Sequence, residues 1–120
     1  MMANEMTNMD RAKAYVEASN AHDLERVEAM FAADAEYVST GAGSHTGRKS
    51  IRTMMDNFFA AFSGLIWVTQ DWHIDADGAH AFDFVMTGLN TQSGEEIKKA
   101  GHERIWINGD GLISRIEVRA

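Results

Sequence analysis

One long apolar stripe sets the first constraint on the fold of this chain. Its members are spaced as on one side of an α-helix, and they are Ile51, Met54, Met55, Phe58, Phe59 and Phe62. Positions i, i+3, i+4, i+7 and i+8 share one helical face, so the stripe predicts an amphipathic helix over about 47–62. We interpret the stripe chiefly as core, with some members lining any internal cavity. Gly64 is the expected helix stop.

Beyond Gly64 the pattern changes to that of β-strands. Four β-prone segments follow, separated by turn signals: "LIWVTQDWHID", "HAFDFVMTGLN", "EIKKAGHERIWI" and "LISRIEVRA". Strands joined by short turns predict an antiparallel meander. In the second segment Phe82, Phe84 and Met86 share one face, and Asp83 is expected to face the other way.

The amino-terminal third predicts two helices and a strand. Thr7 and Asp10 have the spacing of a capping box ahead of a helix over about 8–20. Asp23 is a plausible N-cap for a second, short helix over 24–31. The segment "EYVST" then predicts a short strand. The order of elements favours one α+β domain over residues 1–120, with helices packed on one face of the sheet.

Composition excludes several classes of function. The chain has 120 residues, no cysteine and a net charge of −7. Disulfides and thiolate metal sites are excluded, and the acidic balance argues against nucleic acid or an anionic membrane as partner. No apolar run is long enough to span a membrane, and the first residues lack a signal-peptide pattern. We therefore expect a cytoplasmic protein.

The glycine-rich stretch "GAGSHTGRKS" over 41–50 resembles a phosphate-binding loop only superficially. With Gly47 as the second glycine of G-x-x-x-x-G-K-[ST], the first would be position 42, which is Ala42, and Arg48 replaces the lysine. The βαβ context of such a loop is also missing. We interpret the stretch as a flexible connection from the first strand to the third helix.

The ordered set of motifs resembles a known superfamily. The segment "AYVEASNAHDLERVEAMFAADAEYVSTGAGSHTGRKSIRTMM" is similar to the first half of the ketosteroid isomerases, and "RIWINGDGLISRI" is similar to their last hairpin. These enzymes belong, with the SnoaL-like polyketide cyclases, to the nuclear transport factor 2-like superfamily. The resemblance covers about 8–118. It implies a cystatin-like α+β barrel, in which three helices wrap a curved antiparallel sheet into a cone around an apolar pocket.

The resemblance also implies roles for individual residues. Ketosteroid isomerases use a tyrosine and a protonated aspartic acid as hydrogen-bond donors to an enolate, and a second aspartate as proton shuttle. The tyrosine corresponds to Tyr15 and the protonated acid to Glu103. The shuttling aspartate corresponds to Ser39, whose hydroxyl has no useful basicity unless another base activates it. Isomerisation by the family's usual mechanism is therefore not expected.

The sequence alone leaves both a structural and a functional role open for Glu103 and for Tyr15. Glu103 alternates with Ile105 and Ile107, so a regular strand would point all three inward. A carboxyl on a core-facing row would be expected to stay protonated or to find a partner. A bulge would instead turn it outward. Tyr15 lies on the apolar side of its helix, as a core residue or as a donor in the pocket.

Histidines offer a base but no evident metal site. His45 lies in the glycine-rich stretch, where a neutral imidazole could replace the missing base or simply be solvated. His73 and His80 flank a turn and could meet across a hairpin, but no third ligand is evident. We expect no metal and no cofactor.

The remaining candidates form the pocket wall and an outer surface. Candidate ligand contacts are Tyr37, Ser39, Met55, Phe58, Phe59, Trp67, Phe82, Phe84, Met86 and Ile105. The opposite face of the strand that carries Glu103 presents His102, Arg104 and Trp106, a mixed row that suits a homodimer interface.

Two functions follow as alternatives. One is an isomerase, cyclase or lyase that acts on an apolar carbonyl compound through Tyr15, Glu103 and His45. The other is a non-catalytic ligand-binding or dimerisation module on the same fold.

Overall fold

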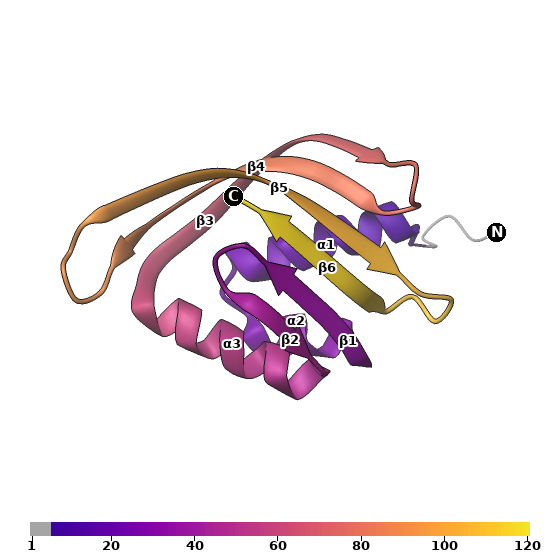
Figure 1. The fold of residues 1–120 in the computed structure, drawn as a ribbon, viewed down its shortest axis with the longest axis horizontal. Coiled ribbons are helices and arrows are strands. Elements are labelled where there is room, and N and C mark those ends of the chain that lie inside the picture. The colour runs from indigo at the N-terminus through magenta and orange to yellow at the C-terminus, as the bar shows by residue number, and fades with distance from the viewer. Residues whose placement is uncertain (1–5) are drawn as a thin grey trace.

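The fold was described with a computed structural model that covers residues 6–120 (Figure 1). Its elements are α1 (Asn8–Asn20), α2 (Leu24–Ala29), β1 (Phe31–Ser39), β2 (Gly43–Thr46), α3 (Arg48–Ala61), β3 (Phe62–Ile74), β4 (His80–Asn90), β5 (Glu96–Ile107) and β6 (Ile113–Arg119). The predicted α+β class with three helices on a curved sheet is confirmed. In the described part of the chain no helix combines the length and apolarity needed to cross a membrane.

Both predicted helix starts in the amino-terminal third are confirmed. The Thr7 hydroxyl accepts the backbone N–H of Asp10, and the Asp10 carboxylate accepts that of Thr7. Asp23 caps α2 by accepting the N–H of Arg26. The predicted end of the second helix is wrong, because β1 already begins at Phe31. Phe31 is fully buried and pairs with β6, so tertiary packing overrides its helical spacing.

The interpretation of 41–50 as a plain loop is also corrected. Residues Gly43–Thr46 form β2, which pairs antiparallel with the end of β1 and places His45 opposite Tyr37. The turn between the two strands is closed by the Ser39 hydroxyl, and Gly43 has a φ of +80° that favours glycine. The short strand provides β1 with a hydrogen-bonding partner along its outer edge.

Helix α3 forms as its apolar stripe predicts, but it stops before Gly64. The helix ends at Ala61 and Phe62 already belongs to β3. Thr91 explains the early end, since its N–H and hydroxyl both donate to the free carbonyl of Ala61. Gly64 instead lies within β3 with a φ of +62°.

The six strands form one curved sheet in the order β2-β1-β6-β5-β4-β3. The predicted meander is present as consecutive antiparallel pairs from β3 to β6. The exception to an antiparallel sheet is the pair β1–β6, which is parallel. These strands are far apart in the chain, so no tight turn fixes their relative direction. Irregularities in β3 near Ser63 and Asp71 bend the sheet around α1 and α3 (Figure 1).

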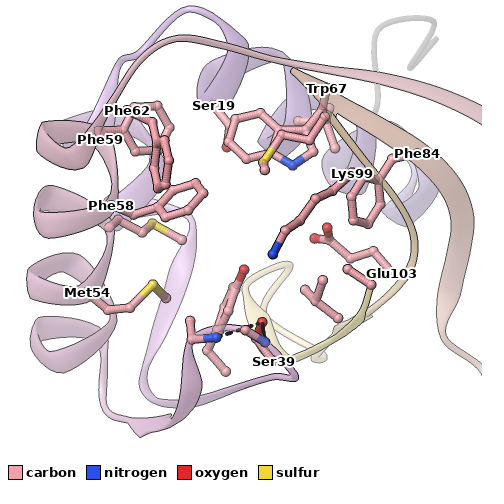
Figure 2. A pocket seen from close by; sticks show the side chains of 18 of the residues that line it. Ser19, Ser39, Met54, Phe58, Phe59, Phe62, Trp67, Phe84, Lys99 and Glu103 are labelled. Carbon is pink, nitrogen blue, oxygen red and sulfur yellow. Dashed lines mark hydrogen bonds between the residues drawn. The ribbon is translucent and has the colours of Figure 1, made fainter. Parts of the chain in front are cut away.

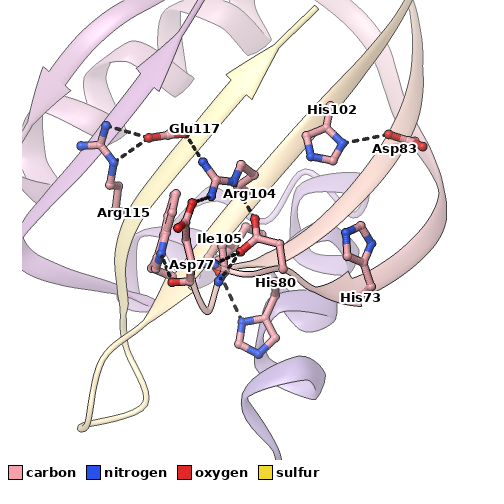
Figure 3. Close-up of polar contacts among 12 residues, drawn as sticks. His73, Asp77, His80, Asp83, His102, Arg104, Ile105, Arg115 and Glu117 are labelled. Atoms are coloured by element: carbon pink, nitrogen blue, oxygen red, sulfur yellow. Dashed lines mark hydrogen bonds and ion pairs between the residues drawn. The ribbon is translucent and has the colours of Figure 1, made fainter.

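Ion pairs within the chain cover part of the outer face of the sheet (Figure 3). Arg104 on β5 contacts Asp75 at 2.7 Å, Glu117 at 2.9 Å and also Asp77. Its guanidinium lies over the Trp106 ring, 4.6 Å from the centroid. His102 contacts Asp83 at 2.8 Å, which confirms that Asp83 faces away from Phe82 and Phe84.

The inner face of β5 contains one position that tolerates no side chain. A Cβ atom at Gly101 would lie 2.5 Å from Cζ of Phe84 and 2.6 Å from the carbonyl oxygen of Arg119. The missing side chain therefore lets the Phe84 ring lie across β5.

We predict that Gly101→Ala destabilises the fold by about 1–3 kcal/mol, because the new methyl group must push apart a packed ring and a backbone carbonyl. Chemical denaturation would measure the change. Gly109→Ala is the matched control, since a Cβ there meets nothing within 4 Å. Equal stabilities of the two variants would contradict the packing described here.

Candidate functional site

A cavity of about 580 Å³ lies between α1, α3 and the inner face of the sheet (Figure 2). Most of the side chains around it are apolar, and the polar ones come from α1, the β1–β2 hairpin, α3 and β5. Its lining comprises Tyr15, Val16, Ser19, Tyr37, Ser39, Gly41, Ala42, His45, Met54, Met55, Asn57, Phe58, Phe59, Phe62, Trp67, Phe84, Met86, Ile97, Lys99, Glu103, Val118 and Ala120.

Aromatic rings form one wall of this cavity. Phe58 packs against Phe62 with ring centroids 5.2 Å apart, and Phe59 packs against Trp67 at 5.9 Å. The backbone of Trp67 is clamped by Asn20 at the end of α1, whose amide donates to the Trp67 carbonyl and accepts its N–H. This clamp ties β3 to α1, so the wall is fixed from two elements.

Glu103 is the most unusual polar group of the cavity. Its side chain is only 5% exposed, and its Oε2 atom is buried without a hydrogen-bond partner. Burial raises the pKa of Glu103 to about 8, so the neutral acid predominates at neutral pH. The predicted inward orientation is confirmed, and the alternative of a bulge that turns Glu103 outward is wrong. A neutral carboxyl facing a cavity can donate a hydrogen bond.

Two tyrosines stand close to this carboxyl. Tyr15 is buried on α1 with its ring edge against Phe31, and Tyr37 is half-buried on β1. Burial raises the pKa of each hydroxyl, and the Glu103 carboxylate raises both pKa values further. The two phenols therefore stay protonated, and both line the same cavity as Glu103.

The Ser39 hydroxyl is engaged by its own hairpin. Its Oγ accepts the backbone N–H groups of Gly41 at 3.2 Å and Ala42 at 3.3 Å. A hydroxyl oxygen has two lone pairs, and here both are used. The Ser39 side chain can still donate its proton, but it has no free lone pair with which to accept one.

His45 lies on β2 at the rim of the cavity. Its Nε2 atom is 2.7 Å from the carbonyl oxygen of Ala42. A carbonyl only accepts, so Nε2 must hold the proton of the neutral ring and Nδ1 must hold the lone pair. The hairpin thereby fixes which nitrogen of His45 could act as a base.

Two predicted ligand contacts, Phe82 and Ile105, do not line the cavity. Both side chains are fully buried and face inward as their strand positions require. The Phe82 ring stacks on Trp72 with centroids 4.0 Å apart. The inner face of the sheet is therefore divided. The part with Phe82 and Ile105 belongs to the core, and the part with Phe84 and Glu103 faces the cavity.

Lys99 is the charged lining residue that the sequence interpretation missed. It lies four residues before Glu103 on β5, and Figure 2 shows its ammonium group directed into the cavity. Strand alternation could have found it, because positions 99 and 103 share a face. Met54 and Phe62 belong to the apolar stripe of which some members were expected at the cavity, and lining residues that were not predicted include Val16, Ser19, Ile97 and Val118.

The histidine pair considered as metal ligands does not come together. His73 is exposed with its Nδ1 atom 2.8 Å from the carbonyl of Asp71, and His80 is buried against the carbonyl of Ile105. Within residues 6–120, no three His, Asp or Glu side chains are arranged as a metal site requires.

Solved structures with the same fold are numerous but distant in sequence. A cystatin-fold protein from Novosphingobium aromaticivorans aligns with a TM-score of 0.82 at 20% identity, covering 95% of this chain and 98% of the other. RV0760c of Mycobacterium tuberculosis, in complex with estradiol-17beta-hemisuccinate, aligns with a TM-score of 0.81 at 17% identity, covering 95% and 93%. SalBIII, an epoxide hydrolase/cyclase-like enzyme of pyran ring formation in the polyether salinomycin, aligns with a TM-score of 0.83 at 16% identity, covering 93% and 88%.

The family is established from the sequence itself. No curated protein matches the chain. The model of the SnoaL-like domain, however, matches residues 12–116, which include every strand but the last residues of β6. The chain therefore belongs to the SnoaL-like domain family.

Proposed function

We propose that this protein binds an apolar carbonyl compound and stabilises its enol or enolate form. The observation that carries the proposal is the buried, unpartnered Oε2 atom of Glu103 at the cavity. A buried polar atom without a partner costs stability, so its retention suits a role in binding. A carbonyl oxygen of a ligand would supply the partner that the protein does not.

The neighbouring groups support a site for developing negative charge. Glu103 is mostly protonated at neutral pH, and Tyr15 and Tyr37 remain protonated beside it. Donors that are already fixed in a dry cavity stabilise charge on a substrate oxygen more strongly than water does. The aromatic wall of Phe58, Phe59 and Trp67 suits a flat apolar ligand.

Proton transfer needs a base, and His45 is our candidate. Ser39, at the position where the resemblance implies an aspartate, has both lone pairs engaged by the hairpin. His45 lines the same cavity, and its Nδ1 holds the lone pair. We propose that Nδ1 of His45 accepts the α-proton of the carbonyl compound while Glu103 and Tyr15 hold the oxygen.

Two structural neighbours are consistent with this class of ligand. RV0760c is seen with a steroid ester, and SalBIII is described as epoxide hydrolase/cyclase-like. The alternative of a non-catalytic ligand-binding module shares the cavity and the donors but not the base. It predicts binding without proton exchange, so the two functions can be separated by experiment.

We predict that the protein accelerates hydrogen–deuterium exchange at the α-carbon of 2-tetralone in D₂O, measured by mass spectrometry. Glu103→Leu should slow this exchange by about 10²–10³-fold, because a donor to the enolate oxygen is lost. His45→Gln should abolish exchange yet retain binding of 2-naphthol, an enol mimic. Binding of 2-naphthol without any exchange by the wild-type protein would favour the non-catalytic alternative.

The stability of Glu103→Leu shows whether its loss of exchange comes from a folding defect. Replacing a buried carboxyl that lacks a partner with leucine should leave the free energy of unfolding unchanged or raise it by about 1–2 kcal/mol. Glu96→Leu, an exposed position at the start of β5, controls for the substitution itself. Loss of both exchange and stability in Glu103→Leu would contradict a functional role for the carboxyl.

We predict that Glu103 titrates near pH 8 when its side-chain carboxyl carbon is followed by NMR, with Glu103→Gln for assignment. Because the folded-state pKa lies above the unfolded value, the folded chain binds the extra proton between pH 4.5 and about 8. The free energy of unfolding of the wild type, relative to Glu103→Gln, should therefore fall as pH rises through this window. The slope should reach at most about 1.4 kcal/mol per pH unit. A midpoint near 4.5 would mean a solvated glutamate.

We also propose that the protein forms a homodimer through the outer face of the sheet. Beside the row of His102, Arg104 and Trp106, this face exposes apolar side chains. Val68 is 66% exposed and Ile66 40% exposed on β3, and Leu89 is 43% exposed on β4. Adjacent exposed apolar residues of this kind favour a protein contact.

We predict that Val68→Asp shifts the protein from dimer to monomer in sedimentation velocity experiments, because a carboxylate would have to be buried in the contact. Thr53→Asp, on the exposed side of α3, should leave the sedimentation coefficient unchanged. A wild-type protein that sediments as a monomer at all concentrations would refute the dimer.

A further inference from the structure

Lys99 is a solvent-exposed cation that lines the wall of a largely apolar cavity. It pairs with Met86 of β4 and stands on the same face of β5 as Glu103. Figure 2 shows its ammonium group pointing into the space between Glu103 and Ser39.

The charge of Lys99 has no partner in the described part of the chain. Every ion pair found among residues 6–120 involves other cations. Glu103 is not its counter-ion, because none of the ion pairs among residues 6–120 joins the two side chains and Oε2 of Glu103 has no hydrogen-bond partner. The side chains of the wall that could become anions, Tyr15, Tyr37 and Glu103, are mostly neutral at neutral pH.

We propose that Lys99 binds a carboxylate of the ligand, so that the cavity selects apolar ring compounds that carry an acidic group. This inference rests on the proposed function, since it adds a second polar contact to the same ligand. An ammonium without a counter-ion gains a charge-assisted hydrogen bond from a bound carboxylate. The neutral donors Glu103 and Tyr15 would bind the carbonyl oxygen of the ligand, and Lys99 would bind its carboxylate.

The surface between the two polar groups indicates the shape of the ligand. Lys99 lies four positions before Glu103 on β5, which is about 13 Å between their Cα atoms. Gly101 lies midway on the same face, and the Phe84 ring lies across it. A ligand that contacts both groups can present an apolar frame to Phe84, with an oxygen toward Glu103 and the acid toward the Lys99 ammonium.

The test compares two ligands of the same shape that differ in charge. They are 6-hydroxy-2-naphthoate and its neutral counterpart 6-hydroxy-2-naphthamide, titrated into the full-length chain by calorimetry at neutral pH. The wild type should bind the naphthoate about tenfold more tightly than the naphthamide. Added salt should weaken binding of the naphthoate only.

Substitutions at two neighbouring lysines locate the effect. Lys99→Met keeps the length of the side chain and removes the charge, and it should make the two affinities equal by weakening the naphthoate alone. Lys99→Arg should keep most of the preference. Lys98→Met is the matched control, because Lys98 is exposed, as Lys99 is, but its strand position faces the other side of the sheet. It should leave both affinities unchanged.

The possible failures are distinguishable. If the wild type binds the naphthamide as tightly as the naphthoate, or if Lys99→Met weakens both ligands equally, the role of Lys99 is refuted and the proposed function stands. If the wild type binds neither these ligands nor 2-naphthol, the proposed function fails, and this inference fails with it.

Discussion

Burial of the Glu103 carboxyl depends on how β5 is covered along its inner side. At one end of the strand, Ile105 is fully buried and Phe82 closes the core by stacking on Trp72. At the other end, α1 and α3 stand away from the sheet and leave the cavity. Glu103 lies at the boundary between these regions, where packing removes water but no protein group replaces it. The proton on Glu103 is thus a consequence of packing, because burial disfavours the charged form of the carboxyl.

The aromatic wall shows how the cavity stays open despite the tendency of apolar side chains to collapse. The Asn20 amide makes two hydrogen bonds to the backbone of Trp67, and His22 contacts the carbonyl of Leu65 at 2.9 Å. These contacts hold β3 at a fixed distance from α1. On the other side, Thr91 fixes the end of α3. The walls are therefore positioned by polar contacts at their ends.

The sequence predicted those elements whose signals are local. The stripe of α3, the capping box at Thr7 and the turns of the meander depend on neighbours within a few residues, and all three are present. The start of β1 and the existence of β2 were missed, because both depend on pairing with distant or weakly patterned segments. In the site, strand alternation correctly predicted that the Glu103 side chain points inward. It could not separate Phe82, which is core, from Phe84, which lines the cavity, since only tertiary contacts such as the stacking of Trp72 on Phe82 distinguish them.

Charge is distributed differently inside and outside this molecule. The chain as a whole carries a net charge of −7, and its carboxylates pair with arginines on the outer face of the sheet. Inside the cavity the one carboxyl is mostly neutral and the lysine is unpaired. An acidic protein that repels anions over long distances can therefore still hold one at close range, because solvent screens the distant charges and leaves the local ones. Selection among ligands would then be decided within the cavity and not by the surface.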